Sequence, residues 1–388
     1  MGGWGNVNNW TPWITQNVLI ALLSRENIAD NDIHETILQA CRSLDYFVDG
    51  YGEDGCCDEG AGYYRAAGLC LFNAMEVLDA VTEDAFLAVY SNNKIRNIAS
   101  YIMNVHVDDR YYINFADCSP VAGRAGIREF LFAKRTENED MMRWAAIDHK
   151  LDSTRLQPTV YNLFYRLQSI FHEEEIAAYD TSVPPVKHDI WYESVGLLIA
   201  RDDRFCLAVK AGCNADSHNH NDTGSITLYR NNLPFLIDVG VETYSARTFS
   251  LQRYEIWTMQ SRYHNVLTFD NAVQLPGAEY RAEVKDVGLS ETGTSITMEL
   301  AKAYPAGTVQ SYTRNVEFRK GQQITVTDTF SPWIKGTCLT LMTLRKPEWE
   351  DGRLVVEGGG QIAFSTAGKI TSSSNGIPNF ESFFPVTI

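Results

Sequence analysis

Residues 217–240 have the sequence SHNHNDTGSITLYRNNLPFLIDVG, and this stretch decides how the second half of the chain is interpreted. Two apolar runs, at 225–229 and 235–238, have the length and composition of β-strands. The densest polar cluster of the chain, at 217–222, lies between the first of these runs and another strand-like run at 205–211. A polar cluster between predicted strands indicates a site carried by a sheet.

Four residues in the second half of the chain have the chemistry of metal ligands. If residues 217–222 are extended, His218 and His220 point the same way, so they share a metal or divide metal binding and catalysis between them. Asp238 ends an apolar strand, where a carboxylate is costly unless it is paired or metal-bound, and His264 opens another apolar strand. Two His and one Asp, with water in the fourth position, suit tetrahedral Zn²⁺.

Simpler explanations of the same residues stay open. A His-x-His pair also fits a turn with solvent-facing polar side chains. Asp238 also fits an ordinary strand-end residue that caps a turn with Gly240. The candidate metal ligands are far apart in sequence, so spacing alone does not decide between a metal site and these alternatives.

Strand-like runs separated by turns continue through the second half of the chain. Regular short strands of this kind predict an antiparallel β-sandwich. The runs lie at 196–200, 205–211, 225–229, 235–238, 265–270, 296–300, 316–319, 323–328 and 338–344.

The first half has helical periodicity instead. Loops rich in Gly, Asp, Asn and Tyr, at 49–60 and 106–123, interrupt the helical stretches. Helix pairs joined by such loops suggest an α/α toroid with its loops gathered at one end. The expected helices lie at 13–23, 32–47, 60–79, 84–103, 126–134, 138–146 and 157–171.

A linker separates the two halves. Residues 180–187, DTSVPPVK, contain two prolines and small polar residues, which do not continue a helix. We therefore expect an α+β chain of two domains, an α/α toroid-like helical domain at 1–179 and an antiparallel β-sandwich at 180–388.

Composition excludes several classes of function. The 388-residue chain has a net charge of −16, which argues against nucleic acid as a partner. No apolar run reaches the roughly 20 residues that a membrane span needs. The first ten residues lack a basic start and an apolar core, so we expect no secretory signal in this chain. Its eight cysteines form no C-x-x-C pair, so we expect free thiols rather than a cysteine zinc site.

The motifs resemble those of the heparinase II/III-like family of polysaccharide lyases. The resemblance rests on the segment 217–244, on YHNV at 263–266 and on SYTRNVEFRKGQQITVTDTF at 311–330. It implies that His220, Asp238 and His264 bind one zinc ion, while His218 lies at the active site. Three ligands from separate segments would make the role of the zinc mainly structural.

The helical half resembles the same family in two segments. DEGAGYYR at 58–65 matches an acidic stretch that leads into a proton-transfer tyrosine, which implies Tyr64, with Tyr63 as the less favoured register. Asn9, with Asn8 close behind, matches the Asn-Trp segment that grips the substrate carboxylate. The family usually has a longer helical domain before this segment, so the resemblance implies an incomplete toroid.

The implied function is β-elimination on a polysaccharide that contains uronic acid. The substrate would be an acidic polysaccharide or oligosaccharide, and the family implies a periplasmic or secreted location. An incomplete toroid also raises the possibility of a homo-oligomer. Further candidates for contact with substrate are Arg65, Tyr244, Arg253 and Tyr254.

Two other classes of function compete with this interpretation. A glycoside hydrolase on an α/α toroid needs two carboxylates that flank the scissile bond. A non-catalytic glycan-binding protein needs only stacking surface, which the 8 Trp and 19 Tyr residues supply. The sequence does not choose among heparan sulfate, alginate, hyaluronan and other acidic polysaccharides, because all of them present the same C5 proton beside a carboxylate.

Overall fold

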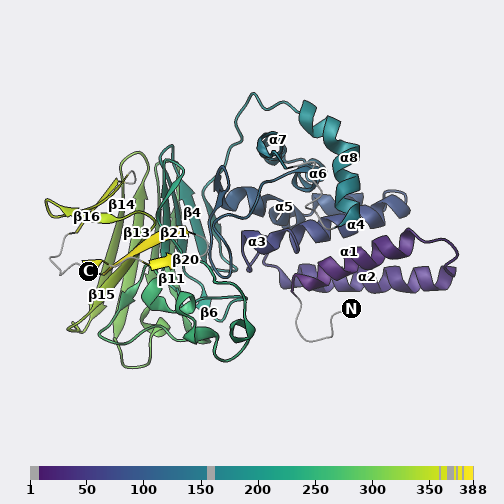
Figure 1. The fold of residues 1–388 in the computed structure, drawn as a ribbon. Coiled ribbons are helices and arrows are strands. Elements are labelled where there is room, and N and C mark those ends of the chain that lie inside the picture. Colours follow the sequence, from purple (N-terminus) through teal and green to yellow (C-terminus); the bar gives the residue numbers. More distant parts are fainter. Residues whose placement is uncertain are drawn as a thin grey trace. The chain divides into compact units, whose positions relative to one another are not determined.

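A computed structural model gives the structure of the chain (Figure 1). Residues 1–7, which belong to the N-terminal segment expected to lack a secretory signal, lie outside the described residues. Residues 155–161, where the helix expected at 157–171 would begin, also lie outside them. The structure describes residues 8–154, 162–357, 360–364, 371–372, 375–377 and 380–387.

The chain divides into two compact units, which we call the helical unit and the sandwich unit. The helical unit comprises Met1–Cys57, Ala61–Val105 and Gly123–Lys187. The sandwich unit comprises Asp58–Gly60, His106–Ala122 and His188–Ile388. The units interleave in sequence, and the domain boundary expected between residues 179 and 180 stays a prediction.

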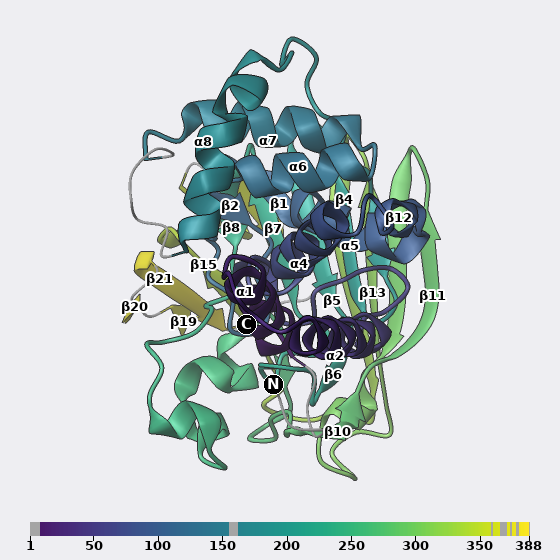
Figure 2. The same ribbon diagram turned by 90° about the vertical axis from the view of Figure 1, so that its right-hand side faces the viewer.

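The helical unit contains packed helix neighbours. Helices α1 and α2 pack together, and α6, α7 and α8 contact one another, as Figure 2 shows for the latter group. The helices are α1 (Trp10–Leu23), α2 (Asp30–Gly50), α3 (Ala61–Tyr64), α4 (Gly68–Val81), α5 (Asn93–Val105), α6 (Ile127–Arg135), α7 (Glu139–Leu151) and α8 (Leu163–Ala178), with a 3-10 turn η1 (Leu87–Ser91).

The helix expected at 60–79 is interrupted. The interruption falls between α3 and α4, where a Cβ atom on Gly68 would lie 2.5 Å from Cε2 of Tyr64. The missing side chain therefore gives the Tyr64 ring its place under the start of α4. The stretch expected at 84–103 is likewise divided, into η1 and α5.

The sandwich unit is built from antiparallel sheets. A ten-stranded sheet has the order β19-β21-β15-β8-β7-β5-β4-β3, with β20 paired to β21 and β9 to β15, and a four-stranded sheet has the order β11-β12-β13-β14. Its strands are β3 (Ile190–Tyr192), β4 (Leu197–Arg201), β5 (Phe205–Lys210), β7 (Ile226–Arg230), β8 (Leu233–Leu236), β9 (Leu267–Thr268), β11 (Glu283–Leu289), β12 (Gly293–Glu299), β13 (Ser311–Arg319), β14 (Gln323–Ser331), β15 (Cys338–Thr343), β19 (Thr371–Ser372), β20 (Asn375–Ile377) and β21 (Phe380–Thr387).

Short pairings complete the unit. The smaller sheets pair β1 with β2, β6 with β10, and β16 with β17 and β18. These strands are β1 (His106–Asp108), β2 (Tyr111–Tyr112), β6 (Cys213–Asn214), β10 (Gly277–Arg281), β16 (Pro347–Glu350), β17 (Arg353–Val356) and β18 (Gly360–Ala363). Between β8 and β9 the chain forms the 3-10 turns η2 (Ala246–Phe249), η3 (Arg253–Glu255), η4 (Trp257–Met259) and η5 (Ser261–Tyr263).

The two large sheets share one hydrophobic core, which makes this unit a β-sandwich. Leu198 and Ile226 from the ten-stranded sheet pack in the same cluster as Ile296 and Phe318 from the four-stranded sheet. Burial alternates along β12 and β13, as expected for strands with one face toward a core. Each strand expected from the sequence overlaps an observed one, and all eight cysteines are free thiols.

One local expectation was wrong. The segment at 217–222 is not extended: it forms turns, and His218 has a backbone φ of 54°. A positive φ places His218 in the left-handed region, which is uncommon for a residue other than glycine. The two imidazoles therefore do not share a face through strand alternation.

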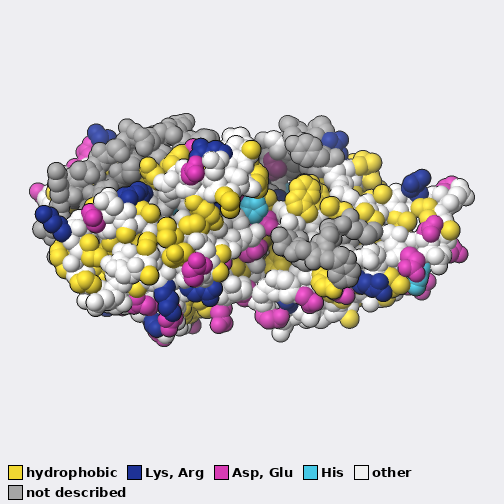
Figure 3. Space-filling view, turned by 90° about the horizontal axis from the view of Figure 1, so that it is seen from below, with side chains coloured by type: hydrophobic (Ala, Val, Ile, Leu, Met, Phe, Trp, Pro, Cys, Tyr) yellow, Lys and Arg dark blue, Asp and Glu magenta, His cyan; other side chains and the backbone are white. Residues whose placement is uncertain are grey.

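The face of the protein drawn in Figure 3 is mixed in charge. On the face in Figure 3, the basic side chains of the described residues lie among acidic and hydrophobic ones and form no continuous basic patch. None of the described helices combines the length and the apolar character that a membrane crossing requires.

A buried arginine connects the sheets beneath the loops that carry the polar cluster. Arg314 is 1% exposed and occupies an inward position of β13. It forms two hydrogen bonds to Asp328, at 2.7 and 2.8 Å, and also donates to the carbonyls of Gly224 and Asn265, each at 2.8 Å. These bonds offset the cost of burying the guanidinium and fix the loop ends after residue 222 and at residue 265.

We predict that Arg314→Ala lowers the free energy of unfolding by about 3–5 kcal/mol, because it leaves a largely buried carboxylate and two carbonyls without their partner. Arg319→Ala is the matched control on the same strand, since its side chain is 57% exposed and pairs with Glu317. The control should change the stability by less than about 1 kcal/mol. Urea unfolding measures both values, and equal effects would contradict this role of Arg314.

Candidate functional site

Three buried residues of the sandwich unit form a group that could hold a metal ion. His220 lies in the loop between β6 and β7, Asp238 follows β8, and His264 follows η5. One ligand atom from each residue lies within 4.8 Å of the other two. The exposed fractions are 0%, 3% and 0%, so solvent does not satisfy these polar groups. The structure thus brings together the three candidates that the sequence separates.

The hydrogen bonds of both imidazoles fit a cation at this point. Nε2 of His264 lies 2.9 Å from the carbonyl of Thr258, which only accepts, so Nε2 carries the proton. Its Nδ1 then faces Oδ2 of Asp238 at 3.0 Å. Nδ1 of His220 is buried and has no hydrogen-bond partner among the described residues. One nitrogen of each imidazole and an oxygen of the carboxylate lie close together, and this donor set suits a divalent transition metal.

Charge is balanced locally between two of these groups. Burial opposes charge on both, but the nearby Asp238 carboxylate raises the pKa of His264 above its ordinary value. Burial also acts to raise the pKa of Asp238, yet the His264 imidazole outweighs this effect and lowers it. Each group thus stabilises the charged form of the other.

Asp117 is a site residue that sequence reasoning missed. It lies in the loop after β2, and its side chain is 0% exposed. Its Oδ2 lies 2.9 Å from Nδ1 of His218, and its Oδ1 lies 3.1 Å from Nε2 of His220. The two histidines thus meet at one carboxylate that lies about a hundred residues upstream, a distance that no local pattern reveals.

Tyr244 and Arg253 complete the surroundings of Asp117. Tyr244 donates from its hydroxyl to Oδ2 of Asp117 at 3.1 Å, and that hydroxyl lies 3.5 Å from Nδ1 of His218. Arg253 donates to Oδ1 of Asp117 at 2.7 Å. Burial acts to raise the pKa of Asp117, but hydrogen bonds from the two histidines and Arg253 outweigh it, so the pKa lies well below its usual range.

The guanidinium of Arg253 is occupied within the protein. It also donates to the backbone carbonyls of His218, Asn219 and Thr248, at 2.9 to 3.3 Å. Tyr254 donates to the side chain of Asn219 at 2.7 Å. Both residues therefore hold the loop around His218 in place, and their expected contact with a substrate stays a prediction.

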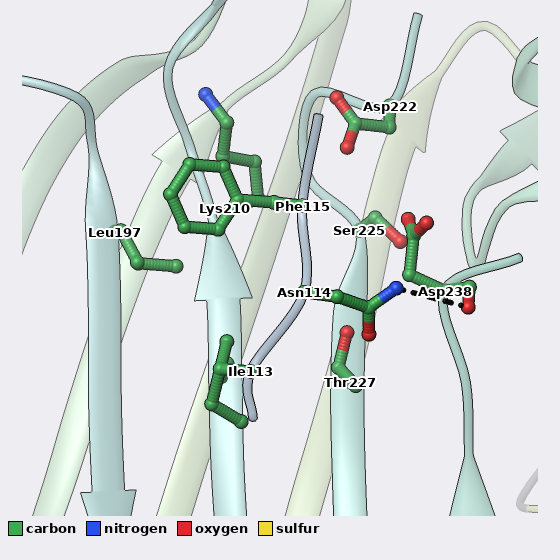
Figure 4. A pocket seen from close by; sticks show the side chains of 10 residues that line it. Ile113, Asn114, Phe115, Leu197, Lys210, Asp222, Ser225, Thr227 and Asp238 are labelled. Atoms are coloured by element: carbon green, nitrogen blue, oxygen red, sulfur yellow. Dashed lines mark hydrogen bonds between the residues drawn. The ribbon is translucent and has the colours of Figure 1, made fainter. Parts of the chain in front are cut away.

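A small cavity lies beside the metal-binding group. In Figure 4, Asn114 points toward the backbone carbonyl of Asp238, to which its side chain donates at 3.3 Å. Burial raises the pKa of Asp222 despite the nearby His264 and Lys210. The cavity is lined by Ile113, Asn114, Phe115, Leu197, Ala208, Lys210, Asp222, Ser225, Thr227 and Asp238.

The remaining candidates belong to the helical unit. Asn9 is buried at the N-terminus of α1, and Asn8 accepts a hydrogen bond from the backbone N–H of Trp10 at 3.0 Å. Arg65 pairs with Glu129 at 3.2 Å and donates to a backbone carbonyl. Their expected roles at a substrate stay predictions.

The surroundings of Tyr64 differ from those expected of a proton-transfer group. Tyr64 is 0% exposed, and its hydroxyl donates to the carbonyl of Ala99 at 3.0 Å. Burial raises the pKa of its phenol well above the usual value. The side chain of Tyr63 is partly exposed. The choice between Tyr64 and Tyr63, the register that the sequence ranked second, stays a prediction.

A known protein family matches most of the sandwich unit in sequence. Residues 184–376 match the sequence model of the family described as heparinase II/III-like, C-terminal. This part of the chain belongs to the heparinase II/III-like family. The resemblance inferred from the motifs is thereby confirmed. No curated protein matches the chain in sequence.

Solved structures share the fold of the chain. A heparan sulfate lyase HepC mutant from Pedobacter heparinus is 15% identical, with a TM-score of 0.68 over 100% of this chain and 58% of that chain. A heparinase III gene product is 16% identical, with a TM-score of 0.70 over 99% of this chain and 57% of that one. The chain thus spans less than two thirds of the length of these proteins.

We predict that the purified protein binds one Zn²⁺ or Co²⁺ per chain and that His264→Gln weakens this binding. Loss of a residue that supports a ligand typically lowers metal affinity about 10–100-fold. Loss of the ligand itself in His264→Gln should lower the affinity by more than this. Equilibrium dialysis with metal analysis measures both affinities. His172→Gln is the control, because His172 lies on α8 in the helical unit. Equal affinities of the wild type and His264→Gln would contradict the assignment.

Proposed function

We propose that this protein takes part in the cleavage of a uronic-acid-containing polysaccharide by β-elimination. The observation that carries the proposal is the His218 imidazole, held by Asp117 beside a three-residue metal-binding group in a heparinase II/III-like domain. We propose glycosaminoglycans of the heparan sulfate kind as the first substrate class, since one similar structure is named as a heparan sulfate lyase and another as a heparinase III.

The reaction makes three chemical demands. The C5–H bond of a uronate breaks beside a carboxylate, so the charge that develops on the carboxylate must be offset by hydrogen-bond donors. A base must take the C5 proton. The C4–O4 bond then breaks as the C4=C5 double bond forms, and an acid returns a proton to the leaving oxygen.

We assign the first demand to His218 from the sandwich unit and to Asn9, with Asn8 as the second choice, from the helical unit. His218 is partly exposed and lies next to the partly exposed phenol of Tyr244. A neutral amide suits a carboxylate because it donates hydrogen bonds without adding a second negative charge. The imidazole of His218 donates to a carboxylate from Nε2 when its ring carries a proton on both nitrogens, since its Nδ1–H faces Asp117.

We assign proton transfer to a tyrosine, with Tyr63 ahead of Tyr64. A phenol that serves as a base must lose its proton near neutral pH, and its ordinary pKa is about 10. The buried environment of Tyr64 raises the pKa further and occupies its hydroxyl, which opposes that role. Tyr244 is the candidate phenol from the sandwich unit, because it is 38% exposed.

We propose zinc as the metal, held by His220, Asp238 and His264. When bound, it would tie together three loops of the sandwich, so its contribution would be chiefly structural. Arg65 and Arg253 already form ion pairs within the protein, so we give them supporting rather than substrate-binding roles.

Three wider expectations remain part of the proposal. The helical unit would be an incomplete α/α toroid, the protein would act in the periplasm or outside the cell, and it would form a homo-oligomer. Negative-stain imaging and sedimentation of the purified protein test the oligomeric state.

The decisive experiment is incubation of the metal-loaded protein with heparan sulfate, hyaluronan and alginate. We expect an unsaturated uronate product, which absorbs in the ultraviolet, from at least one polymer. His218→Ala should lower kcat/KM by about 100-fold or more, because a donor to the developing charge is removed. Cleavage with incorporation of solvent oxygen and without this absorbance would indicate a glycoside hydrolase, and binding without turnover would indicate a glycan-binding protein.

The two adjacent tyrosines provide a matched comparison in the same assay. Tyr63→Phe should abolish turnover while the variant stays folded. Tyr64→Phe should retain turnover and lower the free energy of unfolding by about 1 kcal/mol, the usual contribution of one hydrogen bond. If Tyr64→Phe stays folded and loses turnover while Tyr63→Phe keeps it, proton transfer should be assigned to Tyr64.

A further inference from the structure

The carboxylate of Asp117 lies where metal binding and catalysis would meet. Four side chains approach its two oxygens: His220 and Arg253 contact Oδ1, and His218 and Tyr244 contact Oδ2. An ionised carboxylate only accepts hydrogen bonds, so each of these groups must present a proton to it. One residue thereby constrains the proton positions on two histidines that differ in their proposed roles.

The first constraint acts on His220. Its Nε2 lies 3.1 Å from Oδ1 of Asp117, so the ring proton is on Nε2 and the lone pair is on Nδ1. Nδ1 is the atom that is buried without a hydrogen-bond partner in the described part of the chain. Asp117 therefore selects the tautomer of His220 that can bind a metal.

The second constraint acts on His218 in the opposite sense. Here Nδ1 faces Oδ2 of Asp117 at 2.9 Å, so a neutral ring has its proton on Nδ1 and its lone pair on Nε2. The backbone of His218 is in the left-handed region, and Arg253 donates to its carbonyl at 2.9 Å. Since Arg253 also pairs with Asp117, one ion pair fixes both the ring and the backbone of His218.

We propose that Asp117 is a positioning residue that holds His218 and His220 in complementary tautomers and so couples metal binding to the orientation of the active-site imidazole. Its effect on turnover rests on the proposed lyase function. Its effect on the two rings does not, because both contacts lie within the sandwich unit and can be measured without substrate.

The first test uses the unmodified protein without metal. Nitrogen-15 NMR of the imidazole rings reports which nitrogen carries the proton, and His→Gln variants assign the signals of the 8 histidines. The proposal predicts a proton on Nε2 of His220 and on Nδ1 of His218. The reverse tautomer at either ring would overturn it, even if the chain proves to be a lyase.

The second test separates the two oxygens. In Asp117→Asn, we expect the amide oxygen to stay beside Arg253 and His220, because both donate to Oδ1, while the amide NH₂ takes the position beside His218. His218 should then move its proton to Nε2, while the affinity for Co²⁺ changes less than about 10-fold. Asp117→Ala should lower the Co²⁺ affinity by about 10–100-fold, because His220 loses its support.

Asp189→Ala is the matched control for the loss of a buried carboxylate. Asp189 lies in the same unit, its side chain is 8% exposed, and it pairs with Lys320 at 2.9 Å. It should leave both tautomers and the Co²⁺ affinity unchanged. A purely structural Asp117 would behave like this control, so an unchanged His218 tautomer in Asp117→Asn, or an unchanged Co²⁺ affinity in Asp117→Ala, would overturn the proposal. An inactive wild type with the expected tautomers would instead count against the lyase function alone.

Discussion

The arrangement of the sandwich unit depends on satisfying one fully buried carboxylate. An isolated charge in a protein interior is costly, so Asp117 requires the donors that surround it. These donors come from the loop before β7 and from the turns between β8 and β9, and the carboxylate fixes where those segments lie. Arg314 is a second buried charge that needs partners: its guanidinium donates to Asp328 and to two loop carbonyls.

Hydrogen bonds of a buried amide hold the segments that carry two of the three candidate ligands. Asn265 is 1% exposed and next to His264; it donates to the carbonyls of Ile226 and Ile237 and accepts from the backbone of Met342. Asp238 and His264 thus each lie beside a residue that is itself held by hydrogen bonds. A rigid surrounding of this kind gives a metal site its geometry before the metal binds.

The sequence predicted those features that depend on local pattern and on unusual chemistry. Alternating short strands indicated the sandwich, and Asp238 drew attention because a carboxylate at the end of an apolar strand needs a partner. The strands β10 and β11 were missed, because their Gly and charged residues lack a buried face: β11 is an exposed edge of its sheet. Asp117 was missed because only the tertiary fold brings it to the histidines, and the burial of Tyr64 depends on the absence of a side chain at Gly68.

We propose that one metal ion joins His220, Asp238 and His264 through imidazole nitrogens that the surrounding hydrogen bonds have already selected. Anomalous X-ray diffraction at the zinc edge, on crystals of the zinc-loaded protein, tests it most directly. We expect one strong peak about 2.0–2.1 Å from Nδ1 of both His220 and His264, with the Asp238 carboxylate beside it. A peak bonded through Nε2 of His220, or the absence of any peak among these three residues, would contradict it.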